Sequence, residues 1–77
     1  MNLKEFIEKF AYQFYDTPID EIDAETVYED IEEWSSLIAL SVIAMVDEEY
    51  NVGIGAKEII ESTTVEGLFN TIMQLRK

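Results

Sequence analysis

The chain contains no cysteine and no histidine, and only one proline and three glycines. Without cysteine it has no disulfide, no thiolate nucleophile and no cysteine-based zinc site. Without histidine it has no imidazole base, no Ser-His triad and no histidine pH switch. We therefore expect neither an enzyme nor a metal site, and we identify no catalytic residue.

Positive charge is scarce as well. Five Lys and Arg residues stand against 17 Asp and Glu residues, so the formal net charge is −12. Nucleic acids and anionic membrane surfaces are bound through Lys and Arg, which argues against both as partners. No apolar run reaches the roughly 18 residues of a membrane span, and no signal-peptide pattern opens the chain. These features predict a cytoplasmic protein that binds basic patches on other proteins.

The chain does contain enough apolar residues for a packed core. Its 77 residues are 48% hydrophobic, which is too apolar for a disordered acidic tail. A chain of this length forms one small domain, here residues 1–77, that buries roughly 60% of the surface of its unfolded state. We find no internal repeat and no domain boundary, and we expect a monomer.

The first segment, over about residues 3–17, is predicted to form an amphipathic helix. Apolar residues recur at spacings of three and four, namely Leu3, Phe6, Ile7, Phe10 and Phe14. Asn2 is suited to cap this helix, with Glu5 completing a capping-box-like start. Thr17 and Pro18 are predicted to end it, because the residue before a proline is pushed out of helical geometry.

A long acidic connection follows over residues 16–34. Its nine acids are Asp16, Asp20, Glu21, Asp23, Glu25, Glu29, Asp30, Glu32 and Glu33. Apolar residues that could lie on a core interrupt them: Ile19, Ile22, Val27, Tyr28 and Ile31. The acids do not form an EF-hand, because the sixth position counted from Asp20 is Glu25 rather than glycine. A loop this long usually has a function or its own packing.

Three further helices are predicted in the second half. The first runs from about Ser36 to Tyr50, with the hydroxyl of Ser35 or Ser36 as its N-cap. A short helix over about residues 56–61 follows, and Thr63 and Glu66 form a capping box for the last helix. The predicted fold class is therefore all-α: a small four-helix bundle of three longer helices and one short helix, with a long first loop.

The stretch Trp34-Ser35-Ser36-Leu37, its aliphatic helix and the closing residues Asp47 to Tyr50 form the most informative motif. This stretch resembles the prosthetic-group attachment region of acyl carrier proteins, which read Asp-Ser-Leu, or Trp-Asp-Ser-Leu in a subset. The resemblance covers essentially the whole chain and agrees in length, charge and helix order. Ser35 stands where the family has aspartate, and Glu32-Glu33 precede the motif where the family usually has a glycine.

The resemblance implies that Ser36 carries 4′-phosphopantetheine, transferred from coenzyme A by a phosphopantetheinyl transferase. The arm ends in a thiol that holds acyl groups as thioesters, and this chain has no thiol of its own. The protein would then be a free-standing carrier that serves fatty-acid or polyketide-type enzymes. A phosphodiester at the start of a helix would meet free backbone N–H groups.

The resemblance also implies two sets of residues around Ser36. The first is a partner-recognition set, which would bind basic docking patches on other enzymes. It comprises Leu37, Ile38, Leu40, Ala44, Asp47 and Glu48. An acyl-pocket set comprises Ile43, Val46, Ile54, Ile59, Ile60, Leu68 and Phe69. The alternatives are an incidentally exposed apolar residue at Ile38 and ordinary core packing for the pocket set.

Two other functions stay open. One is a carrier of aminoacyl, peptidyl or other specialised groups, although the Leu-Gly-Gly that often precedes its motif is absent. The other is an unmodified acidic interaction module, such as a helical adaptor or a nucleic-acid mimic. A hydrolytic enzyme is the weakest option, because no carboxylate is placed with a nucleophile.

Overall fold

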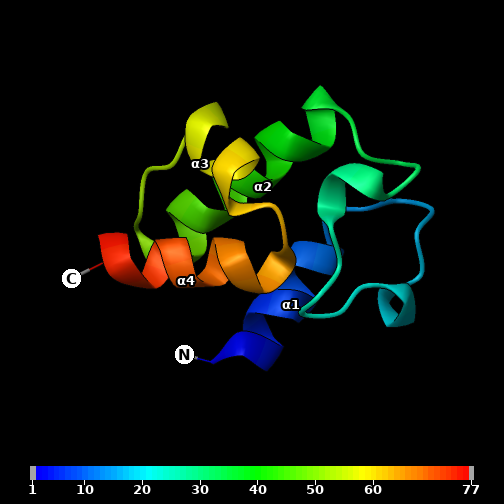
Figure 1. The fold of residues 1–77 in the computed structure, drawn as a ribbon, viewed down its shortest axis with the longest axis horizontal. Helices are drawn as coiled ribbons and strands as arrows, with labels where there is room; N and C mark the ends of the chain where they lie inside the picture. The colour runs from blue at the N-terminus through cyan, green and yellow to red at the C-terminus, as the bar shows by residue number, and fades with distance from the viewer. Residues whose placement is uncertain (1, 77) are drawn as a thin grey trace.

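The computed structural model describes residues 2–76 and contains four α-helices within them. These are α1 (Leu3–Ala11), α2 (Ser36–Tyr50), α3 (Ala56–Ser62) and α4 (Val65–Leu75). Two short 3₁₀ turns, η1 (Ile19–Glu21) and η2 (Tyr28–Asp30), lie in the connection between α1 and α2. The described part of the chain has no β-strand, so the predicted small all-α bundle with a long first loop is confirmed (Figure 1).

Helix α1 begins as predicted but ends early. The Asn2 side-chain oxygen accepts a hydrogen bond from the Glu5 N–H at 2.8 Å. The helix stops at Ala11 and not at Thr17, so the predicted end is wrong. The next backbone N–H groups form turns, and those of residues 15–17 donate to the Glu33 carboxylate instead of to helical carbonyls. Phe14 nevertheless reaches the core through this turn.

The acidic loop is tied to the far end of the chain. Val27 and Thr64 form an isolated β-bridge, and the N–H groups of Val65 and Glu66 donate to loop carbonyls at 3.1 and 2.9 Å. Of the apolar loop residues expected on the core, Ile22 and Tyr28 are buried. Val27 and Ile31 are half-buried and Ile19 is exposed. The loop is therefore a packed part of the domain.

The predicted capping box at Thr63 and Glu66 is wrong by one residue. Thr64 is the N-cap of α4, and its hydroxyl accepts from the Gly67 N–H at 3.0 Å. Thr63 cannot cap because it has φ 69° and ψ −55°, and the Thr64 N–H closes back on the Ser62 carbonyl at 2.7 Å. This is the γ-turn geometry, which β-branched residues rarely adopt.

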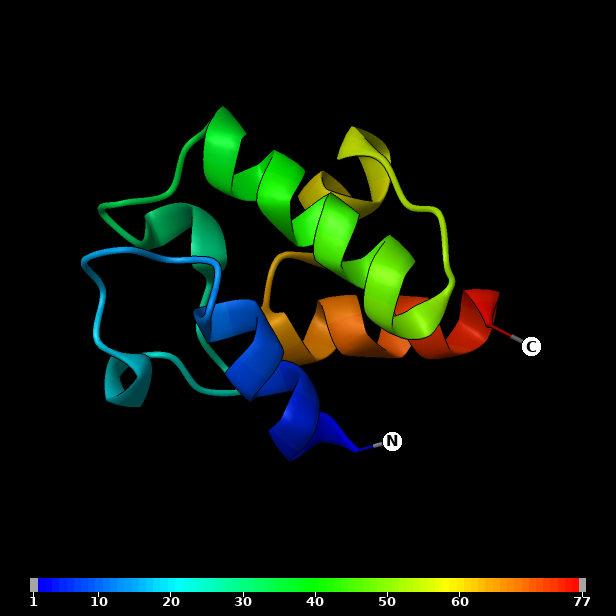
Figure 2. The ribbon, with the colours of Figure 1, turned by 180° about the vertical axis from the view of Figure 1, so that it is seen from behind.

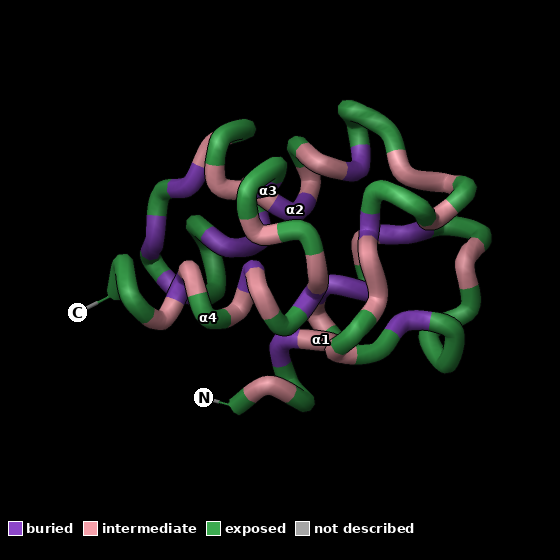
Figure 3. The backbone as a smooth tube through the Cα atoms, in the orientation of Figure 1, coloured by how far each residue is buried: buried purple, intermediate pink, exposed green. Residues whose placement is uncertain are grey.

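Buried positions lie on all four helices and on the loop (Figure 3). Their side chains form one core. Its fully buried members are Phe6, Phe10, Tyr28, Val42, Val46, Val65, Leu68 and Ile72. Seen from behind, α1 and α2 lie in front of α4 (Figure 2). No helix within residues 2–76 is long and apolar enough to cross a membrane.

Candidate functional site

The two serines at the start of α2 have different roles. Ser35 is the N-cap: its hydroxyl accepts from the Ile38 N–H at 3.4 Å, and its carbonyl accepts from the Ala39 N–H at 2.9 Å. Ser36 is the first helical residue and is exposed. Among the hydrogen bonds of residues 2–76, none involves the Ser36 hydroxyl or the N–H groups of Ser36 and Leu37. Ser36 therefore presents a free hydroxyl beside free backbone donors.

The residues before the motif hold it against the core. Trp34 lies with its ring centroid 4.9 Å from that of Tyr28 and is stacked on Phe10 at 6.4 Å, with the planes 12° apart. Its N–H donates to the Ile31 carbonyl at 2.9 Å. Because its backbone and its ring are both anchored, Trp34 sets where the chain enters α2.

Glu33 joins the two ends of the loop. Its carboxylate accepts from the N–H groups of Tyr15, Asp16 and Thr17 at 2.7, 3.0 and 2.9 Å, and from the Thr17 hydroxyl at 2.8 Å. Desolvation raises the pKa of the Glu33 carboxyl, but these four bonds outweigh it and hold the pKa below its ordinary value. The residue directly before Trp34 is therefore fixed by contacts about 16 residues away in sequence.

Tyr28 connects the loop to α3. Its hydroxyl donates to the Ile59 carbonyl, and its backbone N–H donates to the Thr63 carbonyl at 3.3 Å. Burial, together with the nearby charge of Glu29, raises the pKa of Tyr28 to about 12. The neutral hydroxyl thus stays in place as a donor at ordinary pH.

A cavity of about 450 Å³ opens beside Ser36, between α2 and α3. Its lining residues are Glu29, Trp34, Ser35, Ser36, Ala39, Leu40, Ile43, Ala56, Ile59 and Ile60. Apart from the two serines and Glu29, the lining residues are apolar. The arrangement can accept an apolar chain tethered at Ser36.

The structure divides the predicted acyl-pocket set into two groups. Ile43, Ile59 and Ile60 line the cavity, whereas Val46, Ile54, Leu68 and Phe69 do not. Val46 and Leu68 are fully buried, Ile54 is nearly so, and Phe69 packs on Phe6 with ring centroids 5.6 Å apart. These four side chains are core residues in this structure, so the cavity is shallower than the predicted set implies.

The predicted recognition residues form an exposed ridge with one exception. Leu37, Leu40, Ala44, Asp47 and Glu48 are all exposed, at spacings that place them on one side of α2. Ile38 is only 4% exposed, so its assignment to the recognition surface is wrong. It lies four residues before Val42, on the side of the helix that faces the core.

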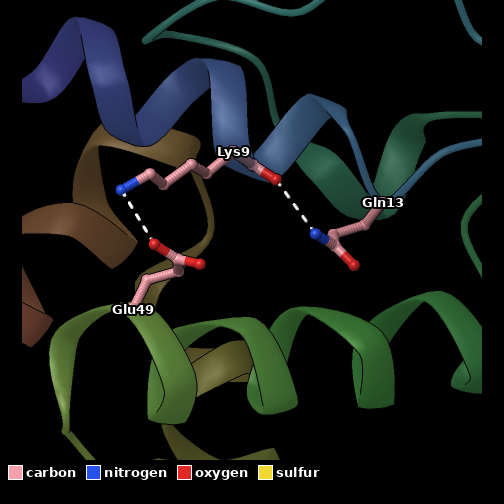
Figure 4. Close-up of polar contacts among 3 residues, drawn as sticks. All are labelled: Lys9, Gln13 and Glu49. Atoms are coloured by element: carbon pink, nitrogen blue, oxygen red, sulfur yellow. Dashed lines mark hydrogen bonds and ion pairs between the residues drawn. The ribbon is translucent and has the colours of Figure 1, made fainter.

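One of the acids at the end of α2, Glu49, pairs with a basic residue of α1. Glu49 forms an ion pair with Lys9 of α1 at 3.1 Å, and the Lys9 ammonium also lies 5.2 Å from the centre of the Tyr50 ring (Figure 4). The hydrogen bond from Glu49 raises the pKa of Lys9. Glu49 therefore links α2 to α1, a role that the sequence did not reveal.

A larger hollow of about 680 Å³ lies within the acidic loop, away from Ser36. Its carboxylates come from Asp16, Glu21, Asp30, Glu32 and Glu33. Across residues 2–76, no three acidic side chains are grouped so that they could hold a metal ion. The Thr17 hydroxyl also lines the hollow, and it donates to the Glu33 carboxylate at 2.8 Å.

Sequence reasoning missed three residues that shape the site, namely Tyr28, Glu29 and Glu33. The sequence offered one signal for Glu33, its place directly before Trp34 at a position where the resembled family has glycine. Comparison with protein-family models, curated proteins and solved structures found no match for this chain.

Proposed function

We propose that this protein is an acyl carrier whose Ser36 hydroxyl receives a 4′-phosphopantetheine arm. One observation carries the proposal: Ser36 is an exposed serine without a hydrogen-bond partner among the described residues, at the mouth of an apolar cavity. A thioester-bound acyl group at the end of the arm could fold back between α2 and α3. The resemblance of residues 34–37 to the carrier motif supports the same serine.

The site fits the phosphate of the arm. The N–H groups of Ser36 and Leu37 are unused, and the positive end of the α2 dipole favours an anion there. In the modification, the Ser36 Oγ would attack the β-phosphorus of coenzyme A. The bond to adenosine 3′,5′-bisphosphate breaks, and the serine proton passes to a base of the transferase.

Ser35 is not an equivalent acceptor. Its hydroxyl is engaged with the Ile38 N–H, and losing an N-cap serine costs about 1 kcal/mol of stability. Modification of Ser35 would remove a cap that α2 needs, whereas modification of Ser36 removes nothing.

The exposed ridge of α2 is the proposed docking face for the transferase and for acyl-loading and synthase enzymes. Leu37 and Leu40 are 76% and 60% exposed beside Ser36, and Asp47 and Glu48 lie further along the helix. An apolar centre flanked by carboxylates suits enzymes with basic patches around their active-site entrance.

The test is the intact mass after incubation with coenzyme A and a phosphopantetheinyl transferase. We expect a gain of one phosphopantetheinyl group in the wild-type chain and in Ser35→Ala, and no gain in Ser36→Ala. Circular dichroism of both variants shows whether each is folded. A gain that survives Ser36→Ala contradicts the proposal, and no gain with several transferases would favour the unmodified acidic interaction module.

The acyl class is tested on the loaded form. The loaded protein is incubated separately with fatty-acyl and with aminoacyl loading enzymes, each with its substrate and ATP, and the thioester formed in each case is measured by mass. Fatty-acyl thioester formation is expected because the cavity wall is mostly apolar. Aminoacyl loading alone would favour the specialised carrier.

A further inference from the structure

A second hollow region runs between α1 and α2, on the other flank of α2 from Ser36. Two adjoining hollows of about 240 and 340 Å³ share Tyr12, Gln13, Met45 and Glu49. With 3.6 residues per turn, Ser41 and Met45 project to the opposite flank of α2 from Ser36 and Ile43. This α1–α2 groove is therefore separate from the proposed acyl site, although Ala44 and Glu48 of its lining also belong to the exposed ridge of α2.

The groove combines one buried apolar side chain, Met45, with acidic side chains and the polar residues Gln13 and Ser41. Met45 is 7% exposed at its base, and Glu8 and Glu48 stand on its two sides. Lys9 is engaged by Glu49 across the groove, as Figure 4 shows, and neither Glu8 nor Glu48 pairs with a cation among residues 2–76. The groove thus keeps uncompensated negative charge next to a buried apolar side chain.

Tyr12 marks one end of the groove. It is 86% exposed, and tyrosine is among the residue types enriched at binding hot spots. Tyr12 follows Glu8 by four residues, so the ring and the carboxylate share one face of α1. A guanidinium can stack on such a ring and pair with such a carboxylate at once, which an ammonium does less well.

Charge decides what kind of chain can occupy the groove. The protein has a net charge of −12, so a second copy would bring a large excess of acid to an acidic groove. A partner must instead bring cations. A third helix can pack in the groove between two neighbouring helices, with its ridges of side chains in their grooves. About two turns of α2 line the α1–α2 groove.

We propose that the α1–α2 groove docks an arginine-bearing amphipathic helix of a partner protein, with one arginine stacked on Tyr12 and paired with Glu8. The apolar face of that helix covers Met45, and further basic residues meet Glu48. Because Ser36 lies on the other flank of α2, the docked state leaves the proposed arm free.

The test uses a synthetic amphipathic peptide of about 14 residues, long enough to become helical on binding, with leucine on one face and arginine on the other. A second peptide has every arginine replaced by lysine. The ¹⁵N-labelled full chain is titrated with each peptide. We expect backbone shifts to cluster at Glu8, Tyr12, Ser41 and Met45. The arginine peptide should bind about two- to fivefold more tightly, because a guanidinium stacks on an exposed ring better than an ammonium does.

Matched variants separate stacking from charge. Tyr12→Ala should reduce arginine-peptide affinity to the lysine-peptide level, and Tyr12→Phe should retain the preference. Tyr15→Ala is the control, because Tyr15 is also 86% exposed but does not line the groove. Glu8→Gln should weaken binding more than Glu25→Gln, which removes the same charge from the exposed loop.

Several results would overturn the proposal: equal affinity for the two peptides, shifts spread over residues 16–33, no binding of either peptide, or self-association through the groove. None of these outcomes bears on Ser36 modification, which is measured separately by mass.

Discussion

At the scale of single residues, the start of α2 shows how adjacent serines divide two tasks. The Ser35 hydroxyl caps the helix by accepting from the Ile38 N–H, and the Ser36 hydroxyl is not needed for the cap. Where the resembled family has aspartate, serine can make the same kind of capping bond without a charge. Serine at this position therefore caps the helix without placing a negative charge beside the proposed attachment site.

Glu33 is a residue whose ionisation contributes to acid stability. Its pKa is below the ordinary value of 4.5 in the folded chain, because desolvation is outweighed by four hydrogen bonds to residues 15–17. A lowered folded-state pKa adds stability above the unfolded-state value, and this stability is lost as the pH falls through the folded-state value.

We therefore expect Glu33→Gln to lower the melting temperature at pH 7 and to reduce the loss of stability on acidification below pH 4.5. Thermal melts followed by circular dichroism over a pH series measure both effects. The control is Glu32→Gln, which removes the same charge from an exposed neighbour. Identical acid profiles for the two variants would contradict the role of Glu33.

Tyr28 allows a test at alkaline pH. Tyr28→Phe leaves the Ile59 carbonyl without its donor, which should cost about 1–3 kcal/mol of stability in urea unfolding. The folded-state pKa of about 12 exceeds the ordinary value of 10.0, so the stability from the neutral hydroxyl is present below pH 10 and is lost as the pH rises towards 12.

The wild-type chain should thus lose stability more steeply than Tyr28→Phe between pH 10 and pH 12. Tyr50, whose pKa burial also raises, contributes to the slope in both proteins. Tyr12→Phe serves as the control because Tyr12 is exposed, and it should match the wild type. Equal slopes for Tyr28→Phe and the wild type would count against this assignment.

At the scale of elements, two connections decide how the helices meet. Helix α1 ends at Ala11 because Glu33 takes up the backbone donors that further turns would need. Helices α3 and α4 meet through the tight turn at Thr63, where the Ser62 carbonyl lies directly against Gly67. The second connection depends on having no side chain at position 67.

Gly67→Ala should destabilise the fold although alanine favours helices. Its Cβ would lie 2.2 Å from the Ser62 carbonyl oxygen, which is backbone and cannot easily move. We expect the free energy of unfolding to fall by a net of about 1–3 kcal/mol, because the cost of this overlap exceeds the gain in helix propensity of about 1 kcal/mol. Urea unfolding measures the change.

The matched control for this substitution is Asn70→Ala, at an exposed position of the same helix. There the added helix propensity is not opposed by a contact, and a gain of about 0.5 kcal/mol is expected. If Gly67→Ala instead raised the free energy of unfolding, the Ser62 carbonyl could move away from position 67 without cost, which would contradict this account.

At the scale of the whole molecule, negative charge is concentrated. All five basic residues lie outside residues 10–56, and the loop and α2 carry most of the acids. Like charges at close range oppose the compact state and are screened by salt. The folded state is therefore maintained against repulsion among these acids.

Sodium chloride and magnesium chloride should both raise the melting temperature, and magnesium should do so at lower concentration. Replacing Asp20, Glu21 and Glu25 by their amides should reduce the salt dependence, because these exposed loop acids make up part of the repulsion. Melting temperatures that are insensitive to both salts would contradict this account.

The sequence by itself determined the fold class, the start of α1, the extent of α2, the excess of acid and the lack of thiol and imidazole side chains. These properties depend on composition or on residues a few positions apart, such as Asn2 and Glu5. Periodicity and capping can therefore reveal them.

Only the tertiary structure decided which serine caps α2, that Ile38 is buried, and that the cavity is bounded by Trp34 and Ile59 instead of reaching Leu68. The contacts responsible join distant residues: Glu33 to residues 15–17, and Tyr28 to Ile59. Local patterns contain no information about such pairs, because they form only when the core brings the loop and the helices together.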